Sequence, residues 1–529
     1  MKRAAAALLL VASVARAGST VTAKSAALAT SSPLATRAGL QILQKGGNAA
    51  DAAVAVAFAL GAVQPQSGNL GGGGFLVYYD ASTHGVWTLD FRELAPRAAT
   101  RDMFARDANA ARNGARAAAV PGTVAGLEAL HAKFGSKPWK ELLEPAVLLA
   151  RDGLRVDTAL AERIAAAKRE RNLDLFNGAA AGTTVPQPEL AATLTRIAEG
   201  GARTLYEGDL AKKLVERVQA AGGTIGFRDL RDYQPLWRAP LKLRYGAYDV
   251  YTVAPPAAGG LLFAEALNIL ANDDLRARGY QTPKALHLIA EAERRAAIDR
   301  GKYAADPAVA RIPYRELLSR ERADTWRRSI DELRATATGT LTEPSAIATE
   351  REHTTHFTIA DARGNVAAVT ISLGDDFGSG FLVPGLGFLL NNAMGDFGAA
   401  PNDLAAQKRP VASMAPTLVL RDGAPFLALG TSGGPSIPTT ILQVFLNVVV
   451  YGRTLPDAVA APRYDQQATP EDLGYERALA PQPTIEALNL MGHGVAARES
   501  IGDVQAILFD RNQLIAVADP RHGGAAGGF

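Results

Sequence analysis

The chain has 529 residues, of which 48% are hydrophobic and 21% are charged, and this composition excludes a disordered or fibrous protein. Its net charge is only +3, with basic and acidic side chains dispersed along the chain, so the charge pattern does not favour nucleic acid or an anionic membrane as a partner. The absence of cysteine excludes a disulfide, a thiolate nucleophile and a zinc–thiolate site. A small molecule or a peptide is the expected substrate.

The first residues have the order of a secretory signal peptide. Lys2 and Arg3 precede an apolar run over residues 4–14, and Ala15-Arg16-Ala17 forms a small-x-small cleavage site. The apolar run is too short to span a bilayer. We therefore predict a signal peptide at residues 1–17 and export to the periplasm or out of the cell. The alternative is a buried N-terminal helix.

Helical patterns dominate the first part of the chain, and strand patterns lie between them. Helices are predicted at residues 46–60, 126–134, 144–151 and 285–303, and strands at 74–80 and 86–91, with a turn at His84-Gly85. The glycine run 71–74 lacks the residues of a phosphate-binding loop and is predicted to be a tight turn. The segment 330–353 is polar without periodicity, so it is predicted to be a mobile connector.

From Thr354 the pattern changes to strands. A hairpin is predicted with strands at 355–360 and 366–373, further strands at 387–390, 417–420 and 426–429, and a helix at 438–451. The whole chain therefore predicts a mixed α and β protein in which strands pack between helix layers, with a functional boundary near residue 353.

Thr354 stands at this boundary. A threonine that opens a strand is usually only a β-former. Its hydroxyl becomes a useful nucleophile when a base lies beside it, and a free α-amino group on the same residue, with an unperturbed pKa of about 7.7–8.0, can be that base. Such an amine exists only after the bond between His353 and Thr354 is cut. We therefore predict that the Thr354 hydroxyl attacks the His353 carbonyl and that water hydrolyses the resulting ester.

Short blocks surround this threonine over nearly the whole chain. After residue 353 they are TTHF (354–357), GNVAAVT (364–370), FGSG (377–380), LLNN (389–392), KRP (408–410) and SM (413–414). Before it they are GGNAADAA (46–53), GGGGF (71–75), DFRE (90–93), VPGT (120–123), PP (255–256) and GG (259–260). In content and order they resemble the gamma-glutamyltransferase family of N-terminal-nucleophile hydrolases. The resemblance implies an α+β fold, a four-layer αββα sandwich whose two sheets take strands from a large subunit (18–353) and a small catalytic subunit (354–529).

The resemblance also implies the catalytic residues, with no cofactor and no metal. Thr354 corresponds to the nucleophile and base, and Ser372 to a hydroxyl that hydrogen-bonds the nucleophile, where the family usually has threonine. Gly433 and Gly434 correspond to the two backbone N–H donors of the oxyanion hole, and glycine lets the backbone approach closely there. Without the family, the glycine pair is simply a strand-to-helix turn.

Three further residues correspond to the donor site of the family. Arg92 matches the arginine that holds the α-carboxylate, Ser413 belongs to the same anion site, and Asp396 matches the aspartate that holds the α-ammonium. Without the family, Arg92 and Asp396 would be solvated surface charges. We favour a γ-glutamyl donor because an Asp396 without an ammonium partner would be an unpaired anion facing the pocket.

The donor site also departs from the family. Gly374, Ala393 and Ala412 stand where the family has asparagine, glutamine and serine, and each lost hydrogen bond is worth about 0.5–1.5 kcal/mol. Asp375 and Asp376 either replace the lost ammonium contacts or face solvent. The segment between Asp396 and Lys408 is short, which predicts an open pocket.

The predicted function is a self-processing γ-glutamyl hydrolase and transferase. It cleaves γ-glutamyl amides such as glutathione through an ester on Thr354 and passes the acyl group to water or to an amino acid or peptide. Its two subunits form a heterodimer from one precursor, and neither nucleic acid nor, after signal removal, a membrane is an expected partner. A related acylase acting on a non-glutamyl, glutaryl-like amide is the first alternative.

Two other function classes remain open. Residues 430–434 (GTSGG) fit the G-x-S-x-G elbow of a serine hydrolase, with Ser432 as nucleophile and Asp465 and His493 or His522 in the required order. A periplasmic binding protein that has lost turnover is the other possibility. No metal site is predicted, because the seven histidines are scattered without a ligand spacing such as His-Glu-x-x-His.

Overall fold

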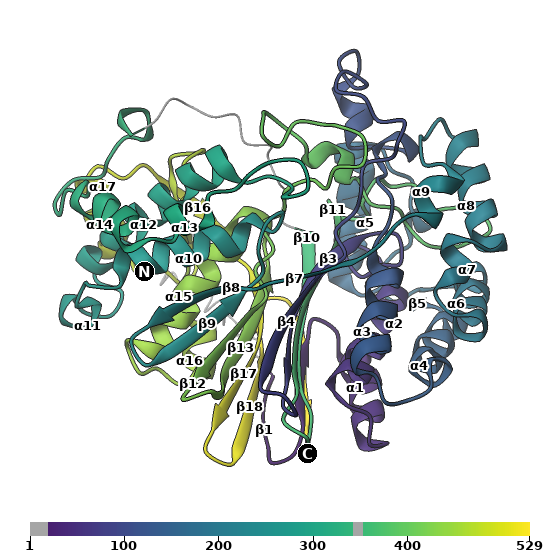
Figure 1. The fold of residues 1–529 in the computed structure, drawn as a ribbon, viewed down its shortest axis with the longest axis horizontal. Coiled ribbons are helices and arrows are strands. Elements are labelled where there is room, and N and C mark those ends of the chain that lie inside the picture. Colours follow the sequence, from purple (N-terminus) through teal and green to yellow (C-terminus); the bar gives the residue numbers. More distant parts are fainter. Residues whose placement is uncertain (1–18, 342–352) are drawn as a thin grey trace, which may run out of the picture.

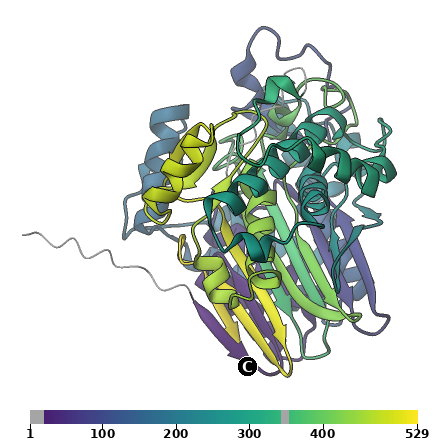
Figure 2. The same cartoon turned by 90° about the vertical axis from the view of Figure 1, so that its left-hand side faces the viewer.

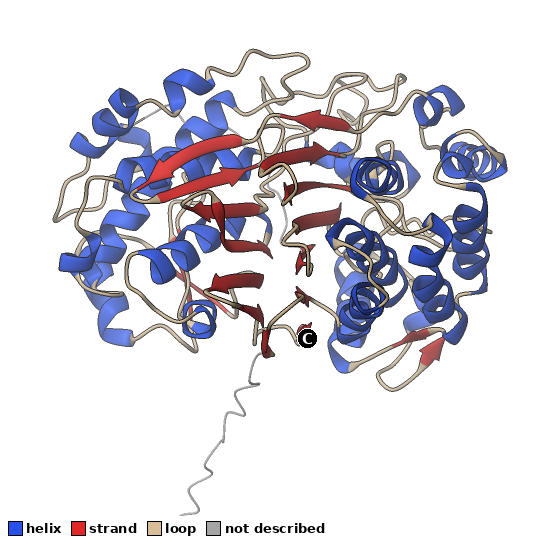
Figure 3. Ribbon diagram, turned by 60° about the horizontal axis from the view of Figure 1, so that its bottom comes forward, coloured by secondary structure: helices blue, strands red, loops and turns tan. Residues whose placement is uncertain are grey.

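Two seven-stranded antiparallel sheets lie face to face at the centre of the molecule, and helices cover their outer faces (Figure 1). The structure is a computed structural model that describes residues 19–341 and 353–529. Viewed from another side, the strands form two columns between two groups of helices (Figure 3). This is the predicted four-layer αββα sandwich. The predicted signal peptide and residues 342–352 of the predicted connector lie outside the described residues.

Each sheet contains strands from both sides of residue 353, as predicted. Sheet 1 has the order β1 (Thr20–Ala23), β18 (Gln513–Ala518), β17 (Asp503–Asp510), β13 (Ala424–Ser432), β12 (Thr417–Arg421), β9 (Tyr248–Thr252) and β8 (Leu241–Tyr245). Sheet 2 has the order β19 (Ala525–Gly528), β2 (Ala27–Thr30), β10 (His353–Ala360), β11 (Val366–Gly374), β3 (Gly73–Asp80), β4 (Gly85–Asp90) and β7 (Leu236–Arg238). Strands β10 and β11 therefore lie inside sheet 2 rather than at its edge.

The first group of helices covers sheet 2. It comprises α1 (Pro33–Gln44), α2 (Ala49–Val63), α3 (Thr123–Phe134), α4 (Trp139–Asp152), α5 (Thr158–Arg171), α6 (Pro188–Gly200), α7 (Arg203–Tyr206), α8 (Asp209–Ala220) and α9 (Phe227–Arg231). Helix α2 packs directly on β10 and β11. Its alanines are buried on every side, and Asn48 and Asp51 form a capping box at its N-terminus.

The second group covers sheet 1 and faces the viewer in Figure 2. It comprises α10 (Ala258–Leu270), α11 (Leu275–Arg278), α12 (Pro283–Tyr303), α13 (Tyr314–Leu317), α14 (Arg320–Arg328), α15 (Ile437–Val449), α16 (Leu455–Ala460) and α17 (Gln482–Leu490). Two minor sheets, β5 (Leu154–Arg155) with β6 (Thr184–Val185) and β14 (Tyr464–Asp465) with β15 (Leu473–Glu476) and β16 (Val495–Arg498), lie outside the sandwich.

Alternating side chains of one strand explain how the layers are held together. In β3, Leu76 and Tyr78 join the apolar cluster beneath the first group of helices, whereas Phe75, Val77 and Tyr79 join the cluster between the two sheets. A strand buried on both faces needs apolar residues at every position, which is the pattern of this part of the sequence.

Most of the predicted elements are confirmed within a few residues. One exception is the strand predicted at 387–390, where Leu389 and Leu390 form only isolated bridges, with Leu382 and Gly71. The tight turn predicted at 71–74 is also wrong, because Gly73 and Gly74 open β3. Within the described residues, no helix is long and apolar enough to cross a membrane.

Candidate active site

Thr354 lies near the start of β10, a strand inside sheet 2. The register against β11 shifts at this point, since His353 pairs with Gly374 whereas Thr354 pairs with Ser372, so Leu373 is skipped. Thr354 is half-buried, while the residues that follow it in the strand are buried. An irregularity of this kind redirects a side chain and is frequent next to active sites.

Ser372 is the cross-strand neighbour of Thr354. Side chains that pair directly across antiparallel strands have Cβ atoms about 4.5–5.5 Å apart. The Ser372 hydroxyl is buried and accepts a hydrogen bond from the Gly374 N–H at 2.9 Å. On the other side, a Cβ atom at Gly72 would come within 2.0 Å of the Ser372 carbonyl oxygen, so glycine is required at residue 72 to let the backbones meet.

Thr354 and Gly433 line one polar cavity of about 610 Å³. Gly433 and Gly434 lie between β13 and α15 with φ angles of +124° and +52°, which places the pair in the strand-to-helix turn that was predicted. A Cβ atom at Gly433 would lie 2.6 Å from the Ser436 Oγ, so a larger residue cannot take this conformation without a shift. The nucleophile candidate and the first oxyanion glycine are thus brought together from strands of different sheets.

Arg92 is buried in an ion-pair network rather than exposed on a surface. It follows β4, and only 1% of its surface is accessible. Its Nη1 is 2.7 Å from the Glu93 Oε2 and its Nη2 is 2.6 Å from the Asp396 Oδ2, while its Nε donates to the Pro410 carbonyl at 3.3 Å. Burial raises the pKa of Glu93, although the Arg92 charge opposes this shift.

Asp396 has a second cationic partner that the sequence did not reveal. The Arg112 Nη1 is 2.9 Å from the Asp396 Oδ1 and 3.7 Å from the Asp375 Oδ1. Both carboxylate oxygens of Asp396 are therefore engaged by guanidinium groups, one by Arg92 and one by Arg112. The expectation that Asp396 would be an unpaired anion without a substrate ammonium is wrong, because the chain supplies its own cations.

The residues that depart from the family pattern lie around this network. A Cβ atom at Gly374, where φ is +97°, would lie 2.1 Å from the Asn392 Oδ1, so the space for a side chain is already filled. Asp375 does not face solvent, since it accepts from the Asn392 Nδ2 at 3.0 Å. Asp376 pairs instead with Arg163 at 2.7 Å and lines the cavity that contains Thr354.

Ser413, predicted to belong to the anion site, is fully buried. Its hydroxyl accepts from the Arg300 Nη2 at 2.5 Å. Arg300 is a residue of α12 that the sequence did not single out. The other two residues that differ from the family pattern, Ala393 and Ala412, are both buried in apolar clusters.

Two histidines and one aspartate near the site have shifted pKa values. Burial lowers the pKa of His356 to about 3, and its ring nitrogens hydrogen-bond the Thr370 and Thr358 hydroxyls at 2.8 and 3.0 Å. In the cavity, burial raises the pKa of Asp503 to about 7, and the nearby Asp519 carboxylate acts in the same direction. Burial lowers the pKa of His522, which lines the same cavity.

The alternative serine nucleophile lacks its partners. Ser432 lines the cavity, but the His522 Nε2 lies 3.3 Å from the Ser500 Oγ and His493 pairs with His287 at 2.8 Å. Asp465 accepts instead from the Thr439 hydroxyl at 2.8 Å. Among the hydrogen bonds of residues 19–341 and 353–529, no Ser–His–Asp chain connects these groups.

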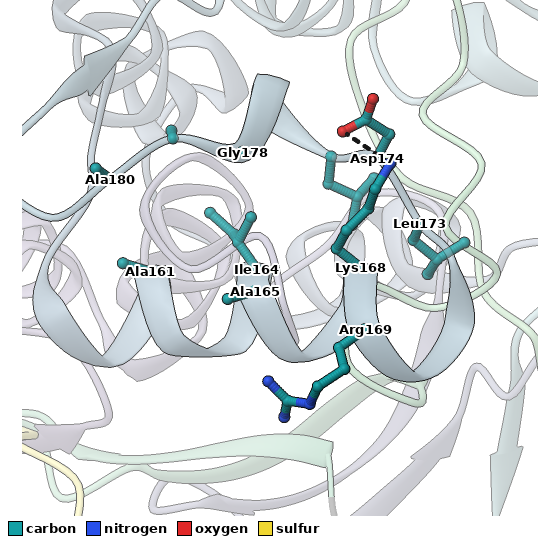
Figure 4. A pocket seen from close by; sticks show the side chains of 11 residues that line it. Ala161, Ile164, Ala165, Lys168, Arg169, Leu173, Asp174, Gly178 and Ala180 are labelled. Atoms are coloured by element: carbon teal, nitrogen blue, oxygen red, sulfur yellow. Dashed lines mark ion pairs between the residues drawn. The ribbon is translucent and has the colours of Figure 1, made fainter.

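A second cavity, of about 390 Å³, lies beside α5 and is lined mainly by short apolar side chains. Figure 4 shows the ion pair between Lys168 and Asp174 there, at 3.5 Å, and no nucleophile candidate among the labelled residues. In the described part of the chain, no group of three or more histidine, aspartate or glutamate side chains is arranged to hold a metal ion.

Comparison with known proteins agrees with this geometry. The model of the family described as gamma-glutamyltranspeptidase matches residues 35–529. The chain belongs to this family. A glutathione hydrolase proenzyme of Escherichia coli (strain K12) is 36% identical over 95% of this chain and 91% of its own length. An acylase ACY 1 proenzyme of Pseudomonas sp. (strain V22) is 35% identical over 91% of this chain and 89% of its own.

A solved structure extends the likeness to the fold. Cephalosporin acylase from Bacillus halodurans superposes with a TM-score of 0.88 and 28% sequence identity, covering 96% of this chain and 97% of its own. The predicted family and the predicted N-terminal-nucleophile hydrolase fold are therefore confirmed. Both a hydrolase and an acylase relative match more than nine-tenths of the chain, so the donor must be inferred from the site itself.

Proposed function

We propose that the protein is a self-processing γ-glutamyl hydrolase and transferase whose nucleophile is Thr354. The Thr354 hydroxyl attacks the γ-carbonyl carbon of a γ-glutamyl amide such as glutathione, and its proton passes to its own α-amine. The oxyanion accepts hydrogen bonds from the Gly433 and Gly434 N–H groups. The C–N bond then breaks, and the leaving amine takes the proton. Water or an acceptor amine attacks the Thr354 ester and regenerates the free hydroxyl.

One observation carries this proposal: Thr354, at an irregularity inside a central sheet, shares a cavity with Gly433 and pairs with Ser372. A nucleophile needs a neighbouring hydrogen-bond partner and an oxyanion site, and the positions of Ser372 and Gly433 support these roles. In the donor site we assign Arg92 and Ser413 to the α-carboxylate and Asp396 to the α-ammonium, two groups that are bonded to the same carbon atom of a γ-glutamyl donor.

The proposed maturation uses the same threonine. The Thr354 hydroxyl attacks the His353 carbonyl carbon, the peptide C–N bond breaks to give an ester and a free α-amine, and water hydrolyses the ester. The products are residues 18–353 and 354–529, which remain together as a heterodimer. Removal of the segment 1–17 and export to the periplasm or beyond complete the proposed maturation.

A second candidate function is an acylase for donors that lack an α-amine. The observation that favours it is the pairing of Asp396 with both Arg92 and Arg112. The two candidates share the nucleophile, the oxyanion site and the self-cleavage, and they differ only in the acyl group.

The test is a pair of alanine variants at the two candidate nucleophiles. The wild-type protein is expected to give two fragments on a denaturing gel and to hydrolyse γ-glutamyl anilides. Thr354→Ala should remain one uncut, inactive chain, because no hydroxyl starts the acyl shift. Ser432→Ala should be cut and retain turnover. A Thr354→Ala chain cut at the same bond, or a Ser432→Ala chain without activity, contradicts the proposal. Wild-type protein without turnover indicates a binding protein.

A further inference from the structure

The turn that carries the proposed oxyanion donors is held by a serine of its own. Residues 433–436 form this oxyanion turn, which joins β13 to α15. We propose that Ser436 is a positioning residue for the reaction: its hydroxyl holds the Gly433 carbonyl and thereby orients the Gly434 N–H toward the oxyanion. This inference rests on the function proposed above and concerns how its oxyanion site is kept in position.

The first support is the geometry of the peptide group between Gly433 and Gly434. This group is trans, and a peptide group is planar, so its C=O and N–H bonds point in opposite directions. The Gly433 carbonyl oxygen accepts from the Ser436 Oγ at 2.8 Å and from the Ser436 N–H at 3.1 Å. Because both bonds fix the carbonyl, they also fix the direction of the Gly434 N–H, which points away from Ser436.

The second support is the state of the Gly434 N–H itself. Gly434 is buried, and within residues 19–341 and 353–529 no hydrogen bond uses its N–H. Buried backbone N–H groups nearly always have a partner, so an exception points to a group that binds there during function. The neighbouring Gly433 lines the cavity that contains Thr354. A tetrahedral intermediate on Thr354 would bring an oxyanion to this cavity.

The third support is that two adjacent glycines need an external constraint. Gly433 and Gly434 have φ angles of +124° and +52°, and glycine has access to more backbone conformations than any other residue. A Cβ atom at Gly433 would lie 2.6 Å from the Ser436 Oγ, so the hydroxyl group lies directly beside the glycine. Ser436 is only 3% exposed, and a buried hydroxyl that lost this hydrogen bond would stay unpaired. The serine therefore stabilises one conformation of the turn.

The fourth support is that the rest of the turn is held from the side of the helix. The Pro435 carbonyl accepts from the Gln467 Nε2 at 3.0 Å, and the Ser436 carbonyl accepts from the Thr439 Oγ1 at 2.9 Å. The Gln467 Nε2 also donates to the Asp465 Oδ1 at 2.8 Å, so two acceptors fix the amide group. Ser436 thus stands on a fixed backbone, and its hydroxyl links this backbone to the peptide group of the oxyanion site.

The experiment separates kcat from KM for a γ-glutamyl anilide, on processed enzyme that is checked by its two fragments. Ser436→Ala should lower kcat at least tenfold and leave KM within twofold of wild type, because oxyanion donors act on the tetrahedral state and not on the bound donor. A boronic acid analogue of the donor forms a tetrahedral adduct with a hydroxyl nucleophile. Its affinity should fall by the same factor as kcat/KM.

Three further variants keep the test interpretable. Ser436→Thr keeps the hydroxyl and should retain most of the wild-type kcat. Ser436→Cys has a side chain of similar size with only a weak S–H donor, so its kcat should lie between those of serine and alanine. Thr193→Val is the matched control on α6, since Thr193 is 2% exposed and its hydroxyl donates to the Leu386 carbonyl at 2.8 Å. It should keep kcat.

The inference is overturned if Ser436→Ala, or Ser436→Cys where the alanine variant does not fold, keeps kcat within threefold of wild type. It is also overturned if Ser436→Thr or Thr193→Val loses as much kcat as Ser436→Ala, or if the boronic acid binds Ser436→Ala as tightly as wild type. Folded alanine and cysteine variants that stay uncut while Ser436→Thr is cut would assign the hydroxyl to maturation, and failure of all three to fold would assign it to the fold; both overturn the inference.

Each of these results leaves the proposed function intact, because wild-type turnover through Thr354 persists. Wild-type protein without turnover, or a Thr354→Ala chain with it, instead contradicts the proposed function. The two failures are therefore distinguishable.

Discussion

The two regions to which we assign catalysis and donor binding, around Thr354 and around Asp396, are held in place in different ways. Around Thr354 the positions are set by backbone: a strand register opposite Ser372 and a glycine turn at Gly433. Around Asp396 they are set by side chains, since Arg92 and Arg112 meet the carboxylate from different loops. A substitution that disturbs the backbone moves every group that the backbone positions, whereas a substitution in a side-chain network removes single contacts. We therefore expect larger effects around Thr354 than around Asp396.

The largest effect is expected where the backbone itself is changed. Gly433→Ala adds a Cβ atom 2.6 Å from the Ser436 Oγ at a φ of +124°. Loss of oxyanion donors costs about 10²–10³ in kcat, and we expect a decrease of this size in processed enzyme.

The matched control is Gly423→Ala, at a φ of +79° in the turn between β12 and β13 with no atom within 4 Å of the added Cβ. It introduces a positive-φ alanine without a clash and should retain kcat. Equal losses in the two variants would show that general backbone strain, rather than the oxyanion site, causes the effect.

A smaller but substantial loss is expected around Asp396. Arg92→Ala leaves Asp396 with one cation fewer and Glu93 without its ion pair. Truncating one partner of a buried charge pair costs at least about 2 kcal/mol, which corresponds to about 30-fold in kcat/KM for any carboxylated donor. Kinetics on glutaryl and γ-glutamyl anilides measure this loss.

Arg97→Ala is the control, since its side chain is 48% exposed and its ion pair with Asp232 lies on the surface. It should change kcat/KM little. Full activity of Arg92→Ala on both anilides would show that the buried network serves the fold and not the donor.

The smallest expected effect is a change in the stability of the folded protein with pH. His356 lies in β10 with a pKa lowered to about 3 by burial, below the value of about 6.5 expected in the unfolded chain. The unfolded state therefore binds the extra proton between these values, and stability falls as pH decreases through this window. Between pH 7 and pH 5 this one group should cost the folded protein about 2 kcal/mol.

The measurement is the free energy of unfolding at both pH values for the wild type and His356→Asn. The variant should be less stable at pH 7 but should lose about 2 kcal/mol less on going to pH 5. His84→Asn, in the exposed turn between β3 and β4, should keep the wild-type slope. If the free energy of unfolding of His356→Asn falls between pH 7 and pH 5 as much as that of the wild type, protonation of His356 is not the cause of the loss of stability.

The same contrast explains what the sequence could predict. The hairpin that begins near Thr354 and the turn at Gly433 follow from local periodicity and from glycine, so their positions were predictable. Family resemblance added the roles of these residues. The strand predicted at 387–390 failed because Leu389 and Leu390 are buried by the packing of a loop and not by a strand pair.

Arg112 and Arg300 were missed for a different reason. Arg112 is 284 positions from Asp396, and Arg300 is 113 positions from Ser413. No local pattern marks a long-range ion pair, and an isolated arginine resembles the solvated arginines around it. The sequence shows that glycine stands at residue 374 but not why a side chain is excluded there, because the Asn392 side chain that fills the space is contributed by a loop.

The interleaving of strands has a mechanical consequence for the cut protein. Hydrogen-bond ladders join β10 to β2, β11 to β3, β12 to β9 and β18 to β1, so each ladder ties a strand before residue 353 to one after it. After a break at the His353–Thr354 bond, these ladders would still join the two fragments within both sheets. Dilution alone should not separate them, and their dissociation would be an unfolding reaction of the whole sandwich rather than the release of a subunit.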